Sequence, residues 1–277
     1  GEFWHLKDAK DLTKYKTGYT FNRNLFSDPN YLSKYLHERG IRLGLTLDPK
    51  EGIMPHEDHY EEIARNMGLT DKSTIPFNVF DKFILNSYFH NLIKPLEDKG
   101  VDFFFLDYSN EKDLYTLRAL TRYHFEDYKK SYEKRGLILA KNGLVASHRY
   151  PALYSGKTLV SWETLNTLPY FNSMASNKGI SWWSHDIGGY EFGMEEALLY
   201  IRYIELACFS PIFRLSSKEG KYYKREPWKW DVKTLKIVED YCQLRHRLIP
   251  YLYTEANKYH EIGLPLIQPL YYTNPAI

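Results

Sequence analysis

The sequence predicts an α/β fold in which parallel strands, each followed by a helix, form a (β/α)8 barrel. Short apolar runs alternate with segments of helical periodicity along most of the chain, as expected for a parallel sheet with helices outside it. The clearest run, residues 101–106, is almost continuously apolar, which is typical of a strand buried on both faces. A length of 277 residues suits such a barrel, which takes about 250.

The first half of the chain contains three of these strands. A helix is expected from Asp28, its N-cap, with Pro29 at the first helical position and Gly40 at its end. The next strand covers 41–47 and ends in Asp48, and helices follow over 57–67 and 81–98. Gly100 then leads into the apolar strand that ends at Asp107.

The second half repeats the alternation. Strands are expected over 136–140, 159–162, 180–183 and 211–215, helices over 113–132, 163–177 and 194–207, and a loop over 149–156. A long helix covers 232–260, with a kink at Pro250, and Gly263 ends it.

Seven strands can be counted, with the first ending at His5. A closed eight-stranded barrel needs one more, so we expect a TIM-type barrel that lacks its first strand in this segment. The barrel portion then covers 1–262, and 263–277 begins a following β domain, because 264–272 alternates like a strand. Flanking β domains of the same longer protein are therefore expected partners.

Composition narrows the classes of function. The 37 basic and 35 acidic residues are interspersed and leave a net charge of +2, which disfavours nucleic acid as a partner. No apolar run approaches the ~20 residues of a membrane span. The two cysteines, Cys208 and Cys242, lack metal-ligand spacing and are interpreted as reduced core thiols, which predicts a cytoplasmic location. We expect no metal and no cofactor.

Polar residues follow the predicted strands. Because barrel catalysis takes place at the carboxyl ends of strands, this pattern predicts an active site there, with Asp107 as the first candidate nucleophile. The alternative is that Asp107 caps the helix beginning near Glu111. The polar strand ends are His5, Asp48, Asp107, Lys141 with Asn142, Trp162 with Glu163, His185 with Asp186, and Arg214 with Ser216.

Several motifs then resemble glycoside hydrolase family 31, which comprises α-glucosidases, α-xylosidases and relatives. Residues 143–156 resemble its G-x-x-G-S-x-R-Y-x-x-x-W-x-G-D stretch, and 179–190 its G-x-x-x-W-x-x-D-I-G-G-F stretch. Residues 209–214 and 225–228 resemble F-x-P-x-x-R and R-E-P-W, and 244–253 is similar to the helix that closes the family's barrel. The matches follow the family's order over almost the whole chain.

The resemblance implies a retaining exo-acting α-glycosidase whose nucleophile is Asp107. Such an enzyme forms a glycosyl ester with one carboxylate, while a second carboxyl about 5–5.5 Å away protonates the leaving oxygen. Asp186 is expected to hold glycone hydroxyls, and Arg214 and Arg149 to line the site unless they are buried structural partners of Glu226 or Asp186. Further candidates for substrate binding are Asp48, Trp183 and His185. The alternative for Trp183, as for Trp4 and Trp162, is packing in the barrel core. The alternative for His185, as for His5, is a place in the core or at the rim.

Two departures from the family pattern affect this interpretation. The acid/base aspartate is replaced by Lys157, whose ordinary pKa of about 10.4 makes it a poor acid. Burial could lower that pKa, or Glu163 could substitute, or Lys157 could simply face solvent. The histidine expected shortly after Arg214 is also missing. An alternative function is therefore a glycosidase-like barrel that binds carbohydrate but hydrolyses weakly or not at all, and nothing in the sequence separates hydrolysis from transglycosylation.

Overall fold

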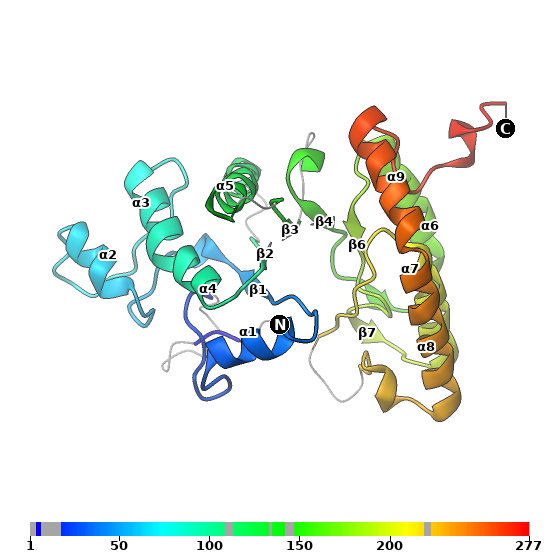
Figure 1. Ribbon diagram of the computed structural model, residues 1–277, viewed down its shortest axis with the longest axis horizontal. Helices are drawn as coiled ribbons and strands as arrows, with labels where there is room; N and C mark the ends of the chain where they lie inside the picture. Colours follow the sequence, from blue (N-terminus) through cyan, green and yellow to red (C-terminus); the bar gives the residue numbers. More distant parts are fainter. Residues whose placement is uncertain are drawn as a thin grey trace. The chain divides into compact units, whose positions relative to one another are not determined.

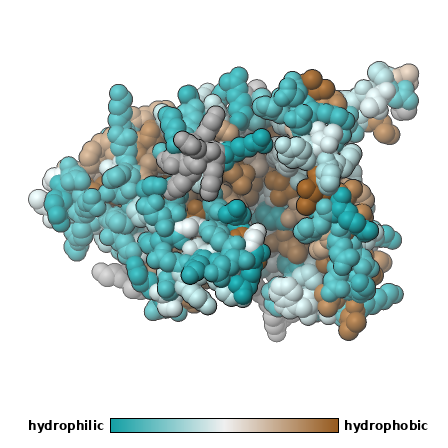
Figure 2. All heavy atoms as spheres, viewed as in Figure 1, coloured by the Kyte–Doolittle hydropathy of each residue, from teal (hydrophilic) through white to brown (hydrophobic). Residues whose placement is uncertain are grey.

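A computed structural model describes residues 4–6, 18–108, 113–132, 135–141, 147–218 and 223–276 (Figure 1). The chain forms two compact units, Gly1–Leu144 and Val145–Ile277. Hydrophilic side chains cover much of the face seen in Figure 2, with apolar side chains between them. Among the helices that are described, none is both long and apolar enough to cross a bilayer.

The first unit is built on three parallel strands. β1 (Gly44–Leu47), β2 (Phe103–Leu106) and β3 (Ile138–Lys141) follow one another across the sheet. The register pairs Leu47 with Leu106 and Leu106 with Ala140. These three residues are completely buried, which confirms the predicted apolar strand at the centre of this unit.

Helices of the first unit begin where local sequence signals place them. α1 (Pro29–His37) is capped by Asp28, whose Oδ1 accepts a hydrogen bond from the Tyr31 amide at 3.0 Å. The helix predicted over 81–98 is α3 (Lys82–Ser87) and α4 (Lys94–Asp98), joined by a π-helical turn, Tyr88–Ile93. The remaining helices are α2 (Tyr60–Asn66) and α5 (Leu114–Tyr132), and a 3-10 turn covers Pro49–Glu51.

The second unit has two short pairs of parallel strands. β4 (Ala152–Tyr154) pairs with β6 (Trp183–Ser184), and β5 (Leu159–Val160) pairs with β7 (Glu191–Gly193). The helices are α6 (Trp162–Asn177), α7 (Ala197–Phe209), α8 (Val232–Arg247) and α9 (Ile249–Ile262). The α7 residues Leu199, Tyr203 and Ile204 fill the core together with Val238 of α8. The helices α7 and α8 pack against each other (Figure 1).

The structure corrects several predicted strands of the second unit. The predicted loop 149–156 contains β4, which at three residues is too short to show a strand period. The predicted strand 159–162 ends at Val160, because Ser161 caps α6 by accepting a hydrogen bond from the Thr164 amide at 3.1 Å. The predicted strand 211–215 is reduced to one bridge, between Ile212 and Ser184.

The two ends of the described chain also differ from expectation. His5 forms a single bridge with Phe21 instead of ending a strand. The long helix 232–260 is divided at Leu248 into α8 and α9, with Pro250 in the first turn of α9, where its missing N–H costs nothing. Residues 264–276 contain a 3-10 turn, Leu270–Tyr272, in place of the predicted strand. The following β domain therefore remains a prediction.

Candidate active site

Asp107 lies immediately after β2 and faces a cation. Its amide donates to the Leu47 carbonyl at 2.9 Å, so the β1–β2 ladder continues to this residue. Lys141, the last residue of β3, places Nζ 3.1 Å from Asp107 Oδ1, with both side chains about one-quarter exposed. Asp113, not Asp107, accepts the hydrogen bond from the Thr116 amide in the first turn of α5, at 3.0 Å. Asp113 therefore caps the described start of α5, while Glu111, near which the sequence predicted the helix to begin, lies outside the described residues.

Asp48 lies immediately after β1, at the same level of the sheet as Asp107. Its Oδ1 accepts a hydrogen bond from the Lys50 amide at 3.2 Å and caps the 3-10 turn that follows. Burial raises the pKa of Asp48 from its ordinary 3.8 to about 7, and the negative charge of Asp107 acts in the same direction. The first unit thus has carboxyl groups at two adjacent strand ends, and burial raises the pKa of the one on Asp48.

Asp186, in the second unit, is the centre of a buried polar cluster. Its side chain is 1% exposed, and its Oδ1 accepts a hydrogen bond from Arg214 Nη2 at 2.7 Å. The Tyr154 hydroxyl donates to Oδ2, and Arg214 Nε donates to Ser184 Oγ at 2.6 Å. Burial raises the pKa of Asp186, while the Arg214 charge opposes that shift. Arg214 therefore pairs with Asp186, one of its two expected partners.

His185 is held inside the second unit by hydrogen bonds at both ring nitrogens. Nδ1 lies 2.7 Å from Ser155 Oγ, and Nε2 lies 2.8 Å from Asn172 Oδ1. The residue is 2% exposed, and burial lowers its pKa to about 4, so the ring is neutral near pH 7. Trp183 stacks on this ring, with centroids 6.5 Å apart, and the buried Trp183 Nε1 has no hydrogen-bond partner among the described residues. His185 thus belongs to the core, and Trp183 keeps one unused donor.

We expect His185 to make stability depend on pH. Its folded pKa of about 4 lies below the ordinary 6.5, so the unfolded chain binds more protons between these values. The free energy of unfolding should therefore fall as pH drops from 6.5 to 4. Urea titrations at several pH values should show a smaller slope for His185→Gln than for the unsubstituted protein, and His260→Gln, whose side chain is 83% exposed, should leave the slope unchanged. Equal slopes for the two variants would contradict the assignment.

Three other candidates of the second unit are exposed. Lys157 faces solvent with Nζ 4.6 Å from the centroid of the Tyr190 ring. Glu163 lies in the first turn of α6, where hydrogen bonds from its own amide and from Ser161 lower its pKa, the opposite of what a proton donor needs. Arg149 ends a 3-10 turn, Ser147–Arg149, with its side chain exposed. The geometry therefore offers no replacement acid among these residues.

The aromatic candidates differ in burial. Trp4 is 3% exposed and donates from Nε1 to the Thr46 carbonyl at 3.0 Å, so it is core packing. Trp162 is 37% exposed and donates to Glu196 Oε1 at 2.5 Å. His5 is buried beside Trp4. Asn142 lies outside the described residues.

Sequence reasoning missed two residues that organise the Asp186 region. Tyr154 occupies the position of the tryptophan in the quoted G-S-x-R-Y motif, and its hydroxyl bonds to Asp186. Arg225, the first residue of the R-E-P-W match, is 6% exposed and donates from Nη2 to the carbonyls of Gly188 and Gly189 at 2.9 and 2.8 Å. Both motifs were visible in the sequence, but the partners of these side chains were not.

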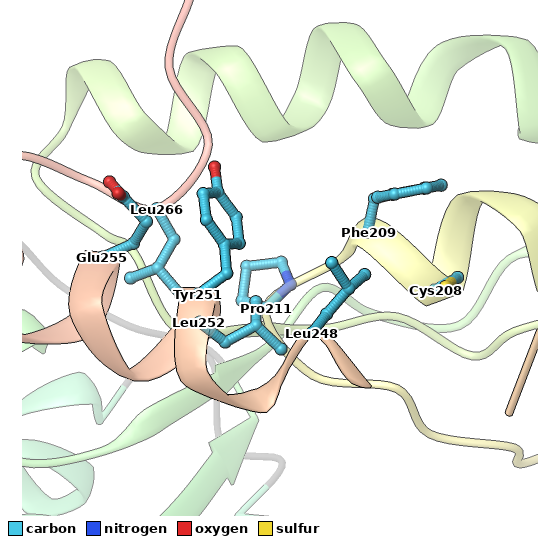
Figure 3. A pocket seen from close by; sticks show the side chains of 8 residues that line it. All are labelled: Cys208, Phe209, Pro211, Leu248, Tyr251, Leu252, Glu255 and Leu266. Carbon is cyan, nitrogen blue, oxygen red and sulfur yellow. The ribbon is translucent and has the colours of Figure 1, made fainter. Parts of the chain in front are cut away.

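A small apolar pocket in the second unit is separate from these residues. It has a volume of about 100 Å³ and lies between the end of α7, α9 and Leu266 (Figure 3). Its one carboxylate, Glu255, already pairs with Lys258 Nζ at 2.7 Å. None of the predicted site residues lines the pocket, so it is not the candidate active site.

Comparison with known proteins identifies the family. Residues 4–255 match the glycosyl hydrolases family 31 TIM-barrel domain. The chain is 26% identical to an α-xylosidase of Saccharolobus solfataricus over 91% of its length, and 26% identical to α-glucosidase 2 of Bacillus thermoamyloliquefaciens over 94%; it spans 38% of each. A solved family 31 α-xylosidase from a soil metagenome, complexed with xylose, superposes with a TM-score of 0.79 at 21% identity, covering 96% of this chain and 47% of that one.

These findings confirm the predicted fold class and the resemblance drawn from the motifs. The parallel strands and surrounding helices of each unit are those of a (β/α)8 barrel domain. The chain belongs to glycoside hydrolase family 31 and contains the family's TIM-barrel domain.

Proposed function

We propose that this domain hydrolyses terminal α-linked sugars as a retaining, exo-acting α-glycosidase, by double displacement through Asp107. The observation that carries the proposal is the position of Asp107, which follows the buried strand β2 with Lys141 Nζ 3.1 Å from its carboxylate. Carboxylates at the carboxyl ends of barrel strands are placed to act on a bound substrate. The α-glucosidase and α-xylosidase relatives support an α-linked sugar.

The Asp186 cluster is proposed to bind the glycone. Arg214 and Tyr154 hold both carboxylate oxygens in place, so the remaining lone pairs have a defined direction and can accept sugar hydroxyls. In the same unit, Trp183 Nε1 has no hydrogen-bond partner among the described residues and is proposed as a donor to a sugar hydroxyl. Arg149 is proposed to contact the sugar only because it falls within the family motif over 143–156.

A mechanism-based label tests the nucleophile. A 5-fluoro-α-glycosyl fluoride should inactivate the full protein with a stoichiometry of one, because the glycosyl ester it forms hydrolyses slowly. Peptide mass spectrometry should then find the sugar on Asp107. A label on any other residue would contradict the proposal.

The second candidate function is a sugar-binding barrel with weak or no hydrolysis. It is favoured by Lys157, which takes the place of the family's acid/base aspartate and is exposed. General acid help is worth about 10²–10⁴ in rate, and poor leaving groups need it most. An α-glycosyl fluoride turned over without any turnover of the matching disaccharide would support this candidate, whereas efficient disaccharide hydrolysis would contradict it.

The protein as a whole is proposed to be larger than this domain. The chain spans 38% of the length of its curated relatives, which leaves room for flanking β domains. Carbohydrate is the proposed partner. A cytoplasmic location stays a proposal, supported by the two free cysteines, Cys208 and Cys242.

A further inference from the structure

Lys157 lies beyond the carboxyl end of β4 in the second unit, at the position where the family motif has a carboxylate. We propose that Lys157 binds a phosphate group and that this phosphate is the leaving group of the substrate, an α-glycosyl phosphate. The inference names a substrate class for the proposed function and rests on that function. It gives Lys157 a binding role in place of the acid/base role of its motif position.

Strand pairing places Lys157 at the same end of the sheet as Asp186. β4 and β6 pair in parallel up to their last residues, and Lys157 and Asp186 follow shortly after these ends. The Tyr190 amide donates to the Thr158 carbonyl at 2.8 Å, which joins the segment after Lys157 to the segment after Asp186. The carboxyl ends of parallel strands are where barrel domains bind their substrates.

The ammonium group of Lys157 has no carboxylate partner among the described residues. It contacts the face of the Tyr190 ring, with Nζ 4.6 Å from the centroid. By contrast, Lys218, which contacts the Phe192 ring in the same way, also pairs with Glu191 Oε2 at 3.0 Å. An exposed ammonium group that an aromatic face orients, and that no carboxylate neutralises, suits an anionic ligand.

Two backbone donors adjoin this ammonium group. The amides of Gly156 and Lys157 donate no hydrogen bond within the described part of the chain, whereas the Ser155 amide donates to the Ser184 carbonyl at 3.0 Å. Gly156 has a φ of 101°, and a Cβ there would meet no atom within 4 Å apart from its chain neighbours, so open space borders the turn. Successive amides in a turn beside a lysine are the donors with which proteins bind phosphate.

The chemistry of the leaving group accounts for a cation at this position. A sugar leaving group departs as an alkoxide unless an acid protonates it, and a lysine ammonium group is a poor acid. A phosphate ester carries its own acidic hydroxyl, with a pKa of about 6, so its monoanion departs as hydrogen phosphate without a proton from the enzyme. The phosphate gains one negative charge as the bond breaks, and an adjacent ammonium group stabilises that charge.

The reaction balances without a general acid. In the first step an Asp107 oxygen bonds to the anomeric carbon, the bond from that carbon to the phosphate oxygen breaks, and its electron pair leaves with the phosphate. In the second step a water oxygen bonds to the same carbon as the Asp107 ester breaks, and the released proton passes to hydrogen phosphate. Attack of hydrogen phosphate on the ester reverses the first step and needs no general base.

Kinetics of the full protein test the substrate class, with the sugar whose α-glycosyl fluoride is turned over fastest. We expect kcat/KM for the α-glycosyl phosphate to exceed that for the matching disaccharide about 10²–10⁴-fold, because only the disaccharide needs the missing acid. With the fluoride as donor, added inorganic phosphate should yield the α-glycosyl phosphate, which phosphorus NMR detects. Disaccharide turnover equal to or above that of the glycosyl phosphate would overturn the inference and leave the proposed function standing.

Substitutions of Lys157 test its role. Lys157→Met removes the ammonium group and should lower kcat/KM for the glycosyl phosphate about 10²–10³-fold, while the fluoride changes less than about tenfold. Lys157→Arg keeps the charge and should lose less than about tenfold on the phosphate. Lys157→Asp should reverse the preference, because it supplies a carboxyl group that can protonate a sugar leaving group and repels phosphate.

The control is Lys178→Met, the same change at the exposed C-cap of α6, which precedes β6 and so lies before its amino end. It should keep all the rates. Equal losses on phosphate and fluoride in Lys157→Met would overturn the inference while Asp107→Ala stays inactive. Turnover by Asp107→Ala, or no turnover of any α-glycosyl fluoride by the unsubstituted protein, would overturn the proposed function and this inference together.

Discussion

Asp107→Ala is expected to reduce kcat/KM for every α-glycoside by on the order of 10⁴-fold or more, because no other group then forms the glycosyl ester. The loss should affect fluorides and disaccharides alike, since every substrate has to form the glycosyl ester with Asp107 whatever its leaving group. Steady-state kinetics with both substrates measure the loss.

Chemical rescue makes this prediction specific. Azide can occupy the space left by the Asp107 side chain and attack the anomeric carbon directly, so the product should be the inverted β-glycosyl azide. NMR of the product distinguishes the β-glycosyl azide from the α-glycosyl azide. Rescue that gives the α-azide, or residual turnover within about tenfold of the unsubstituted protein, would exclude Asp107 as the nucleophile.

Arg225→Met should lower the free energy of unfolding by about 3–5 kcal/mol, because removing one partner of a buried pair leaves the other charge buried and unpaired. Arg225 and Glu195 are 7% and 12% exposed, with Nη1 3.3 Å from Glu195 Oε1. The change also removes the donors to the Gly188 and Gly189 carbonyls. Since Asp186 lies two residues before Gly188, KM should rise as well.

Arg202→Met is the matched control for this second prediction. Arg202 pairs with Glu205 at 2.6 Å, but its side chain is 53% exposed, and exposed pairs contribute about 0–1 kcal/mol. Urea denaturation should therefore separate the two variants by more than about 2 kcal/mol. A similar loss for both would contradict the larger stabilisation expected of the buried Arg225.

The sequence by itself determined the barrel class, the strand that ends at Asp107 and the family. These follow from local signals, because a continuous apolar run favours a strand inside a parallel sheet, where Phe104 and Leu106 of β2 are buried, and a helix start needs a cap such as Asp28. The predicted position of the acid/base residue, Lys157, could also be named from the sequence, since it falls within a motif. The apolar strand, the helix cap and the family motifs all depend on residues that are neighbours in the chain.

Only the tertiary structure decided which side chains meet. β4 was hidden in a predicted loop because three residues are too few for a strand period, and its Tyr154 meets Asp186 through a strand pairing. The contact of Lys141 with Asp107, and the position of Asp48 at the strand end next to Asp107, come from the register of β1, β2 and β3. Register is set by packing between distant segments, and burial, which raises the pKa of Asp48, exists only in the folded chain.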